Sequence, residues 1–380
     1  MSDDAELPYW LALRRAGLGS TNFALLLNHF GSIGAAWEAS PKALADAGVE
    51  PKYARAFGQA KANFDRRREL ELLERHDVRV YTWLGADFPS SLRDIPQSPP
   101  VLFAKGSLGP QFVEAVAVVG TRHVTPYGRQ ATEAFSEALA KAGVAIISGL
   151  ARGVDAIAHR VAVEQGVPTV AALAGGIDKV YPRENEGLSR RILENGCLVS
   201  EYPPGIPARP DYFPRRNRIV SGLAKATLVI EAGEGSGALH TANWAFEQGR
   251  DVFAVPGPIF SRQSQGTNQL IRENTARLVA TPEQLCEELN LLAAGRQMAL
   301  TEAGGQQEAP SEKQSQPPMR APSTTPEEGK MLHWLQDQPR HIDEIVRASG
   351  LPITVVSSTL QLMELKGLVR QERPMVYTMA

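Results

Sequence analysis

The sequence lacks the features that would place the chain across a membrane. No apolar run reaches the length of about 18 residues that a membrane-spanning helix requires. The first residues, MSDDAELPYW, are acidic and do not show the charged-then-apolar pattern of an export signal. We therefore expect a cytoplasmic protein that has no membrane partner.

Cysteine is scarce. The chain has two cysteines, Cys197 and Cys286, which lie far apart and outside any spacing typical of metal ligands. The seven histidines are scattered, and none pairs with a cysteine. This pattern is typical of reduced thiols in a cytoplasmic protein, so we expect neither a disulfide nor a bound metal.

An excess of one charge is also missing. The 380 residues carry a formal net charge of −2, and the central part of the chain is balanced in the same way. A site for a polyanion must therefore come from local clusters of cations, because the total charge attracts none. The length predicts two or three domains, and the apolar fraction of 43% is that of a globular protein.

Residues 1–80 are predicted to be helical, because apolar residues recur at spacings of three and four. Two breaks, GLGS at 17–20 and LADAGVEP at 44–51, divide this region into helical hairpins. A helix-hairpin-helix or SAM-like domain of this kind can present backbone N–H groups to a DNA phosphate. The alternative is that the glycines only allow tight turns between packed helices.

Residues 81–295 alternate between short apolar runs and helical segments of about 10–15 residues. Runs such as VAVV and TLVIEA are apolar throughout, as expected for strands that are covered on both faces. The prediction is an α/β fold: an extended Rossmann-like, doubly wound, mostly parallel sheet.

The C-terminal part of the chain has two sections. Residues 296–326 are rich in Gln, Pro, Ser and Glu and are predicted to be a flexible linker. Residues 327–380 contain three amphipathic segments followed by a strand, a turn and a strand, which predicts a winged-helix domain. Its third helix has few cations, so binding of DNA and docking of a protein both remain open.

The loops expected at one edge of the sheet are rich in Gly, Ser, Thr and Arg. Ligands gather beyond the carboxyl ends of parallel strands. Glycines let the backbone approach a phosphate, and the N-terminus of the following helix adds partial positive charge. SGLARG at 148–153, with a helix from about Val154, is one such predicted anion cradle. The residues predicted to cradle phosphate are Gly120, Thr121, Gly153, Gly235, Ser236 and Gly237. Each loop alone is equally explained as an ordinary turn.

The segment FPRRNR at 213–218 carries three arginines at a predicted helix start. Cations at this end oppose the helix dipole, which favours an anionic ligand nearby. The alternative is a solvated turn, or pairing with Glu201 or Glu231. No GxGxxG follows the first strand and no GxxxxGK[ST] occurs, so we expect neither a dinucleotide cofactor nor a Walker-type ATPase.

Seven motifs closely resemble, in order, those of the bacterial DNA-processing protein A (DprA/Smf) family. They are VGTRHVTPYG, SGLARGVDAIAH, GGIDKVYPREN, GCLVSEYPPG, FPRRNRIVSGLA, VIEAGEGSGALHTANWA and GRDVFAVPG. The resemblance is strongest over residues 80–290. It implies a protein that binds single-stranded DNA without catalysis, forms a homodimer through its Rossmann-like domain, and loads a RecA-type recombinase onto incoming DNA in natural transformation and recombination.

The resemblance also implies a binding pocket, carried over motif by motif. Its residues are Arg122, Ser148, Gly149, Arg152, Lys179, Tyr181, Arg216 and Arg218. The arginines would bind phosphates, and the ring of Tyr181 would stack on a base or, alternatively, pack beside Pro182. The chain departs from the family pattern where Thr121 replaces a serine, where GALHT replaces a GSLIT-like segment, and near residues 274–276, which lack a glycine-alanine pair.

Two other functions compete with this interpretation. The segment VIEAGEGSGALHTANWAFE also resembles nucleotide-hydrolysing relatives, in which Glu231 or Glu247 would serve as acid or base. Those enzymes favour a PGGxGT loop, which this chain lacks. The third possibility is that the winged helix is the main DNA-binding part, as in a regulator that binds duplex DNA.

Overall fold

The computed structural model describes residues 3–291, 334–335, 340–349, 351, 353–365, 368–373 and 376–379. The chain divides into two compact units, residues 1–306 and residues 307–380. The regions predicted as separate domains at 1–80 and 81–295 both lie in the first unit. The predicted linker at 296–326 lies outside the described residues.

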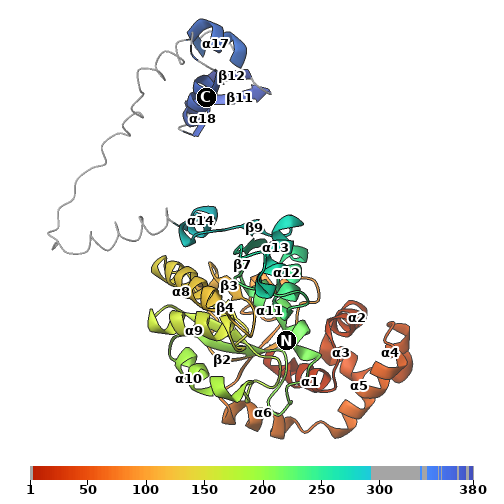
Figure 1. Ribbon diagram of the computed structural model, residues 1–380. Helices are drawn as coiled ribbons and strands as arrows, with labels where there is room; N and C mark the ends of the chain where they lie inside the picture. The colour runs from red at the N-terminus through yellow and green to blue at the C-terminus, as the bar shows by residue number, and fades with distance from the viewer. Residues whose placement is uncertain are drawn as a thin grey trace, which may run out of the picture. The chain divides into compact units, whose positions relative to one another are not determined.

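The first unit is built on a nine-stranded sheet (Figure 1). Its strands are β1 (Arg79–Thr82), β2 (Val101–Gly106), β3 (Val116–Val119), β4 (Ile146–Ser148), β5 (Thr169–Ala172), β6 (Cys197–Ser200), β7 (Ala226–Val229), β8 (Asp251–Ala254) and β9 (Arg277–Leu278). Their order is β1-β2-β6-β5-β4-β3-β7-β8-β9. From β6 to β9 all neighbours are parallel, and β1 and β2 add antiparallel at one edge. The predicted mostly parallel sheet is confirmed.

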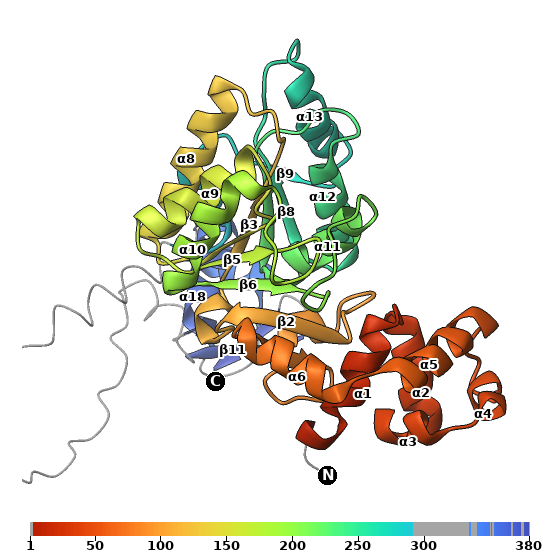
Figure 2. The same ribbon diagram turned by 90° about the horizontal axis from the view of Figure 1, so that it is seen from below.

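Helices cover both faces of the sheet, as a doubly wound fold requires (Figure 2). One face carries α8 (Pro126–Lys141), α9 (Val154–Glu164), α10 (Glu186–Asn195) and α14 (Pro282–Glu288). The other carries α7 (Ser90–Arg93), α11 (Tyr212–Leu223), α12 (Gly237–Glu247) and α13 (Gln265–Arg272). Short 3-10 turns occur at η1 (Pro110–Phe112), η2 (Arg183–Asn185) and η3 (Arg262–Ser264). Among the described helices, none is long and apolar enough to cross a membrane.

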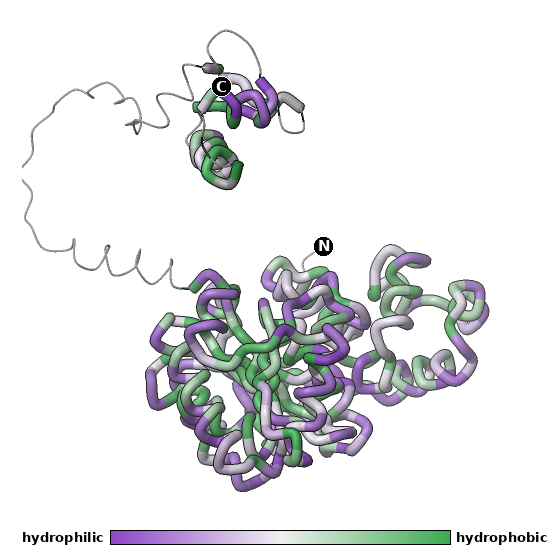
Figure 3. The backbone as a smooth tube through the Cα atoms, turned by 45° about the horizontal axis from the view of Figure 1, so that its top comes forward, coloured by the Kyte–Doolittle hydropathy of each residue, from purple (hydrophilic) through white to green (hydrophobic). Residues whose placement is uncertain are grey.

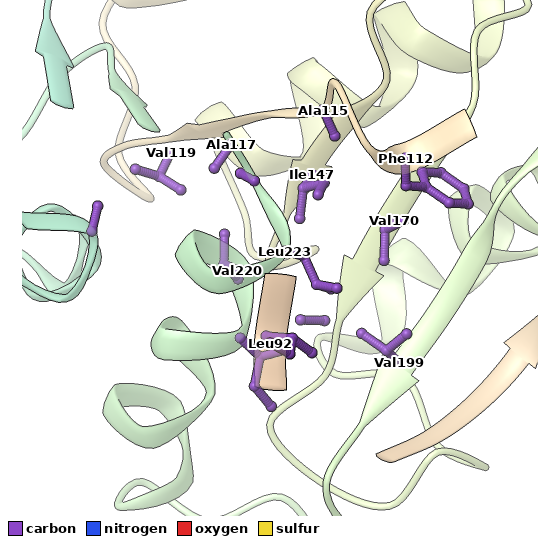
Figure 4. Close-up of a cluster of buried hydrophobic side chains, with 14 of the residues drawn as sticks. Leu92, Phe112, Ala115, Ala117, Val119, Ile147, Val170, Val199, Val220 and Leu223 are labelled. Carbon is purple, nitrogen blue, oxygen red and sulfur yellow. The ribbon is translucent and has the colours of Figure 1, made fainter. Parts of the chain in front are cut away.

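Strand β3 explains why the sequence shows no alternation of polar and apolar residues here. Val116 and Val118 pack under α8 and α9, whereas Ala117 and Val119 pack under α11 and α12. Figure 4 shows the second cluster, in which Val220 of α11 faces these strands. Both faces of the strand are therefore buried. Hydrophobic residues accordingly gather at the centre of the first unit (Figure 3).

The N-terminal part of the first unit is helical, as predicted. Its helices are α1 (Asp3–Arg15), α2 (Ser20–Phe30), α3 (Ile33–Glu38), α4 (Pro41–Asp46), α5 (Pro51–Asn63) and α6 (Arg66–Arg75). Gly17 and Gly48 lie in the two predicted breaks, each with a φ of 84° that favours glycine. The tight-turn explanation therefore accounts for both glycines. Their proposed contact with DNA phosphate stays a prediction.

The described part of the second unit forms a winged helix. It contains β10 (Arg340–His341), α17 (Ile342–Ser349), α18 (Ile353–Leu365), β11 (Val369–Arg373) and β12 (Val376–Met379), with a sheet of order β10-β12-β11. Buried Ile345, Leu360 and Tyr377 contribute to its core. Helix α18 has no Lys or Arg, so the choice between a DNA and a protein partner stays open.

Candidate nucleic-acid interface

A cleft of about 850 Å³ opens at the C-terminal edge of the parallel strands. It lies where the strand order reverses, between β3 and β7, which is where doubly wound sheets bind ligands. The loops after β3, β4, β7 and β8 and the first half of α11 line it. The sequence-predicted residues among its lining are Gly120, Thr121, Arg122, Gly149, Arg216, Gly235, Ser236 and Gly237.

Arg122, Phe213 and Tyr181 form a cationic and aromatic ledge at the rim of the cleft. The guanidinium of Arg122 lies 5.1 Å from the centre of the Phe213 ring. The rings of Phe213 and Tyr181 meet edge to face, with centres 5.7 Å apart and planes at 68°. Tyr181 is 57% exposed, so it retains a free face for stacking. Arg122 is exposed, and within the described ranges no carboxylate pairs with it.

Phe213 is a member of this ledge that the sequence reasoning missed. The signal was present, because Phe213 opens the FPRRNR segment and lies in the first turn of α11. Aromatic rings beside cations are the groups on which proteins stack unpaired bases.

Arg216 forms the buried floor of the cleft. Its guanidinium donates to the carbonyl oxygens of Gly149 and Ala172, and its Nε donates to Oδ1 of Asn217 at 3.2 Å. Gly149 is required here, because a Cβ would overlap the guanidinium. Burial lowers the pKa of Arg216 to about 10, against the opposing charge of Asp155, so the group stays charged at neutral pH.

Asp155 uses the backbone amides that were expected to cradle phosphate. Its Oδ2 accepts from the N–H groups of Gly149 at 3.1 Å and Ala151 at 3.3 Å. Burial raises the pKa of this carboxyl, while the charge of Arg216 and the two N–H groups oppose the shift. The prediction of an anion cradle at residues 148–153 is thereby corrected, since two of its donors are already paired within the protein.

The loop after β7 is open to the cleft, although the N–H of Ser236 donates to the carbonyl of Gly233 at 3.1 Å. Gly235 and Gly237 flank Ser236, whose hydroxyl accepts from the N–H of Ala238 and caps α12. A Cβ at either glycine would meet nothing within 4 Å, so open space lies beside both. Thr241, one turn into α12, lines the same wall. This wall offers open space beside its backbone, but the N–H groups of Ser236 and Ala238 are already paired within the protein. Its phosphate-cradling role therefore stays a prediction.

Sequence comparisons point to one family. The profile of DNA recombination-mediator protein A matches residues 79–290, and that of the DprA winged-helix domain matches residues 315–373. The chain belongs to the DNA recombination-mediator protein A (DprA/Smf) family. The first match covers all nine strands of the sheet and every loop that lines the cleft.

Relatives of known name or structure agree with this assignment. Protein Smf of Synechocystis sp. is 34% identical over 98% of this chain and 99% of its own length. DNA processing protein A from Streptococcus pneumoniae matches with a TM-score of 0.67 and 31% identity, over 74% of this chain and 97% of its own. Its counterpart from Helicobacter pylori is described for a unique single-stranded DNA binding mode. It matches with a TM-score of 0.51 and 27% identity, over 57% of this chain and 96% of its own.

Arg218, assigned to the DprA pocket by resemblance, lies outside the cleft lining. It is 5% exposed, and its Nη2 pairs with Oε2 of Glu201 at 2.8 Å. Arg14 of α1 pairs with the same carboxylate at 3.4 Å. Burial would raise the pKa of Glu201, but the two guanidinium groups outweigh it and lower the pKa to about 2. The alternative of pairing with Glu201 is therefore the correct one for Arg218, and its phosphate-binding role is withdrawn.

Five other assigned residues do not line the cleft. Tyr181 reaches it only through its contact with Phe213, and the remaining four fall into two groups. Ser148 is buried and donates to the carbonyl of Val118 at 2.7 Å, and Gly153, with a φ of 74°, packs against the backbone of residues 121–122. These positions are structural. Arg152 and Lys179 are exposed, but Arg152 forms two hydrogen bonds with Glu184, at 2.8 and 2.9 Å. Because this ion pair is exposed and therefore weak, the phosphate-binding roles of Arg152 and Lys179 stay predictions.

Glu231 and Glu247, the two carboxylates expected to act in a nucleotide-hydrolysing enzyme, are not in the cleft lining, which includes Asp155 and Glu234 instead. Glu231 is 1% exposed and accepts from the N–H of Thr125 at 3.0 Å and from its hydroxyl at 2.6 Å. Glu247 is exposed at the far end of α12 from the cleft. In the described ranges, no cluster of His, Cys, Asp and Glu could hold a metal ion.

Proposed function

We propose that this DprA-family chain binds single-stranded DNA in the cleft between β3 and β7, without catalysis. The observation that carries the proposal is the ledge of Arg122, Phe213 and Tyr181. These residues come from three distant segments, yet together they present a cation and two rings at one rim. The single-stranded DNA binding described for the Helicobacter pylori relative supports the same ligand.

Single-stranded DNA suits this surface better than duplex DNA does. Unpaired bases expose faces that stack on aromatic rings whatever the sequence, whereas bases in a duplex are stacked on one another. Guanidinium groups bind phosphate oxygens in a planar, bidentate way. A ledge of rings and one free guanidinium therefore favours an unpaired strand with little preference for sequence.

The test is a titration of a labelled oligothymidine, followed by fluorescence anisotropy at several salt concentrations. We expect Arg122→Ala to weaken binding and to reduce the slope of log K against log salt by about 0.7, which corresponds to one phosphate contact. The matched control is Arg160→Ala, which removes an exposed arginine of α9 outside the cleft lining. Equal affinity and slope in all three proteins would remove Arg122 from the site.

We further propose that the chain forms a homodimer and loads a RecA-type recombinase onto incoming DNA in natural transformation and recombination. Family membership supports both proposals. Sedimentation of the full chain tests the dimer. Assembly of a RecA-type filament on single-stranded DNA, timed with wild type and with Arg122→Ala, tests the loading. Acceleration by wild type alone is the expected result, and no acceleration by either protein would contradict it.

A further inference from the structure

The wall of the cleft opposite the Arg122 ledge has a feature that the proposed function does not use. It is the loop between β8 and α13, residues 255–264, hereafter the β8–α13 loop. Only its first three residues fall in a family motif, GRDVFAVPG. Arg262 and Gln263 of this loop line the cleft, as does Gln265 at the start of α13. The loop follows the carboxyl end of a parallel strand, so it stands on the same edge of the sheet as the ledge.

The tip of the β8–α13 loop is apolar and fully in solvent. Phe260 is 94% exposed and Ile259 is 77% exposed, the two highest values among the exposed large hydrophobic residues of the described ranges. An aromatic side chain contributes most to the free energy of folding when it is buried. A ring that remains outside therefore makes little contribution to the stability of this fold.

Hydrogen bonds and close packing fix the base of the loop. The side chain of Asn268 bonds both the N–H and the carbonyl of Gly257, at 3.2 and 3.0 Å. The hydroxyl of Tyr127 donates to the carbonyl of Pro256 at 2.6 Å. A Cβ on Gly257 would overlap the side chain of Ser264, so the two ends of the loop are in close contact. The base of the loop is therefore held in one place beside the cleft.

Arg262 gives this wall a charge that matches the opposite rim. It is exposed, and across the described residues it has no carboxylate partner. The cleft thus has an unpaired arginine on each side, Arg122 and Arg262. Arg122 lies over the ring of Phe213, and Arg262 is two residues from Phe260 in the same loop. Cations that alternate with rings correspond to the phosphates and bases of an unpaired strand.

We propose that the β8–α13 loop is a second contact site for single-stranded DNA, in which Arg262 binds a backbone phosphate and Phe260 stacks on a base. This inference rests on the proposed function and extends it, because a strand seated on the Arg122 ledge crosses the cleft to reach the loop. Short strands occupy the ledge alone, and only longer strands also contact the loop. Strand length is therefore the variable that separates the two sites.

The experiment measures the affinity of oligothymidines from about 4 to about 16 nucleotides for the full chain. We expect Phe260→Ala to leave the shortest strands unaffected and to weaken the longest about tenfold, the size of one lost stacking contact. Phe260→Trp should restore the affinity. Arg262→Ala should reduce the salt slope by about 0.7 for long strands only. The control is Phe246→Ala, which removes an exposed ring (60%) of α12 outside the cleft lining.

The possible outcomes separate the two proposals. If wild type binds short strands and Phe260→Ala equals wild type at every length, the second contact site is refuted and the ledge stands. If wild type binds no strand of any length, the proposed function itself fails. If Phe260→Ala leaves every affinity unchanged but alters sedimentation, the ring docks a second copy of the chain, which also overturns the inference.

Discussion

The buried pairing of Glu201 with Arg14 and Arg218 predicts a large and pH-dependent effect of Glu201→Gln. The folded-state pKa of Glu201 is about 2, against an ordinary value of 4.5. Each unit of pKa corresponds to about 1.4 kcal/mol, so ionised Glu201 contributes about 3 kcal/mol to the free energy of unfolding at neutral pH. Loss of one partner from a buried ion pair typically costs about 3–5 kcal/mol, which is consistent.

The direction of the pH dependence follows from the depressed pKa. The contribution is complete above the unfolded-state pKa of about 4.5 and is lost as the pH falls toward the folded-state value of about 2. Protonated Glu201 and the glutamine variant are then equivalent, because neither carries the charge. We therefore expect wild type and variant to differ by about 3 kcal/mol at pH 7 and to converge as the pH approaches 2.

Urea unfolding followed by tryptophan fluorescence measures this difference. Four of the five tryptophans, Trp10, Trp37, Trp83 and Trp244, lie in the first unit, so the signal reports mainly its transition. The control is Glu184→Gln, which breaks the exposed pair with Arg152 and should leave the transition unchanged. A difference below about 1 kcal/mol at pH 7 for Glu201→Gln, or one that stays constant to low pH, would refute the reasoning.

Two further substitutions test the floor of the cleft and the structural role of Glu231. Gly149→Ala places a Cβ on the Arg216 guanidinium and should lower the free energy of unfolding by about 1–3 kcal/mol in urea, whereas Gly237→Ala, with open space around its Cβ, should not lower it. Glu231→Gln leaves one Thr125 donor without an acceptor and should cost about 1–3 kcal/mol of stability. Its affinity for single-stranded DNA should stay at the wild-type value, and neither protein should release free base from nucleoside monophosphates. Release of base by wild type alone would support catalysis instead.

Much of the cleft was predictable because the fold itself brings its parts together. Apolar runs with glycine stops identify parallel strands, and parallel strands end at one edge. That rule alone placed Arg122, Gly149 and the loop at 235–237 in one cleft, although more than a hundred residues separate the first from the last. Arg262 follows from the same rule, since it comes after β8 at the same edge, but no motif drew attention to it.

The errors have physical reasons that differ from residue to residue. Arg216 and Arg218 are two positions apart on α11, and a helix turns about 100° per residue, so their side chains point to different surroundings. This error was avoidable from helix geometry. The pairing of Arg152 with Glu184 could not be predicted in this way, because 32 residues separate them and only the folded chain brings them together.

Helix α11 consequently joins two regions that the sequence presented as separate. Phe213 and Arg216 of this helix line the cleft, while Arg218, on another face of the helix, pairs with Glu201. Glu201 in turn pairs with Arg14 of α1. The stacked rings of Tyr202 and Tyr212, 4.0 Å apart, reinforce the same junction at the first residue of α11. Because a short helix is stiff, the contacts at Glu201 also fix the position of the α11 residues that line the cleft. Three of the arginines expected to bind phosphate thus have different roles. Arg122 is free to bind a ligand, Arg216 forms the floor of the cleft, and Arg218 fixes the position of α11, the helix to which Arg216 belongs.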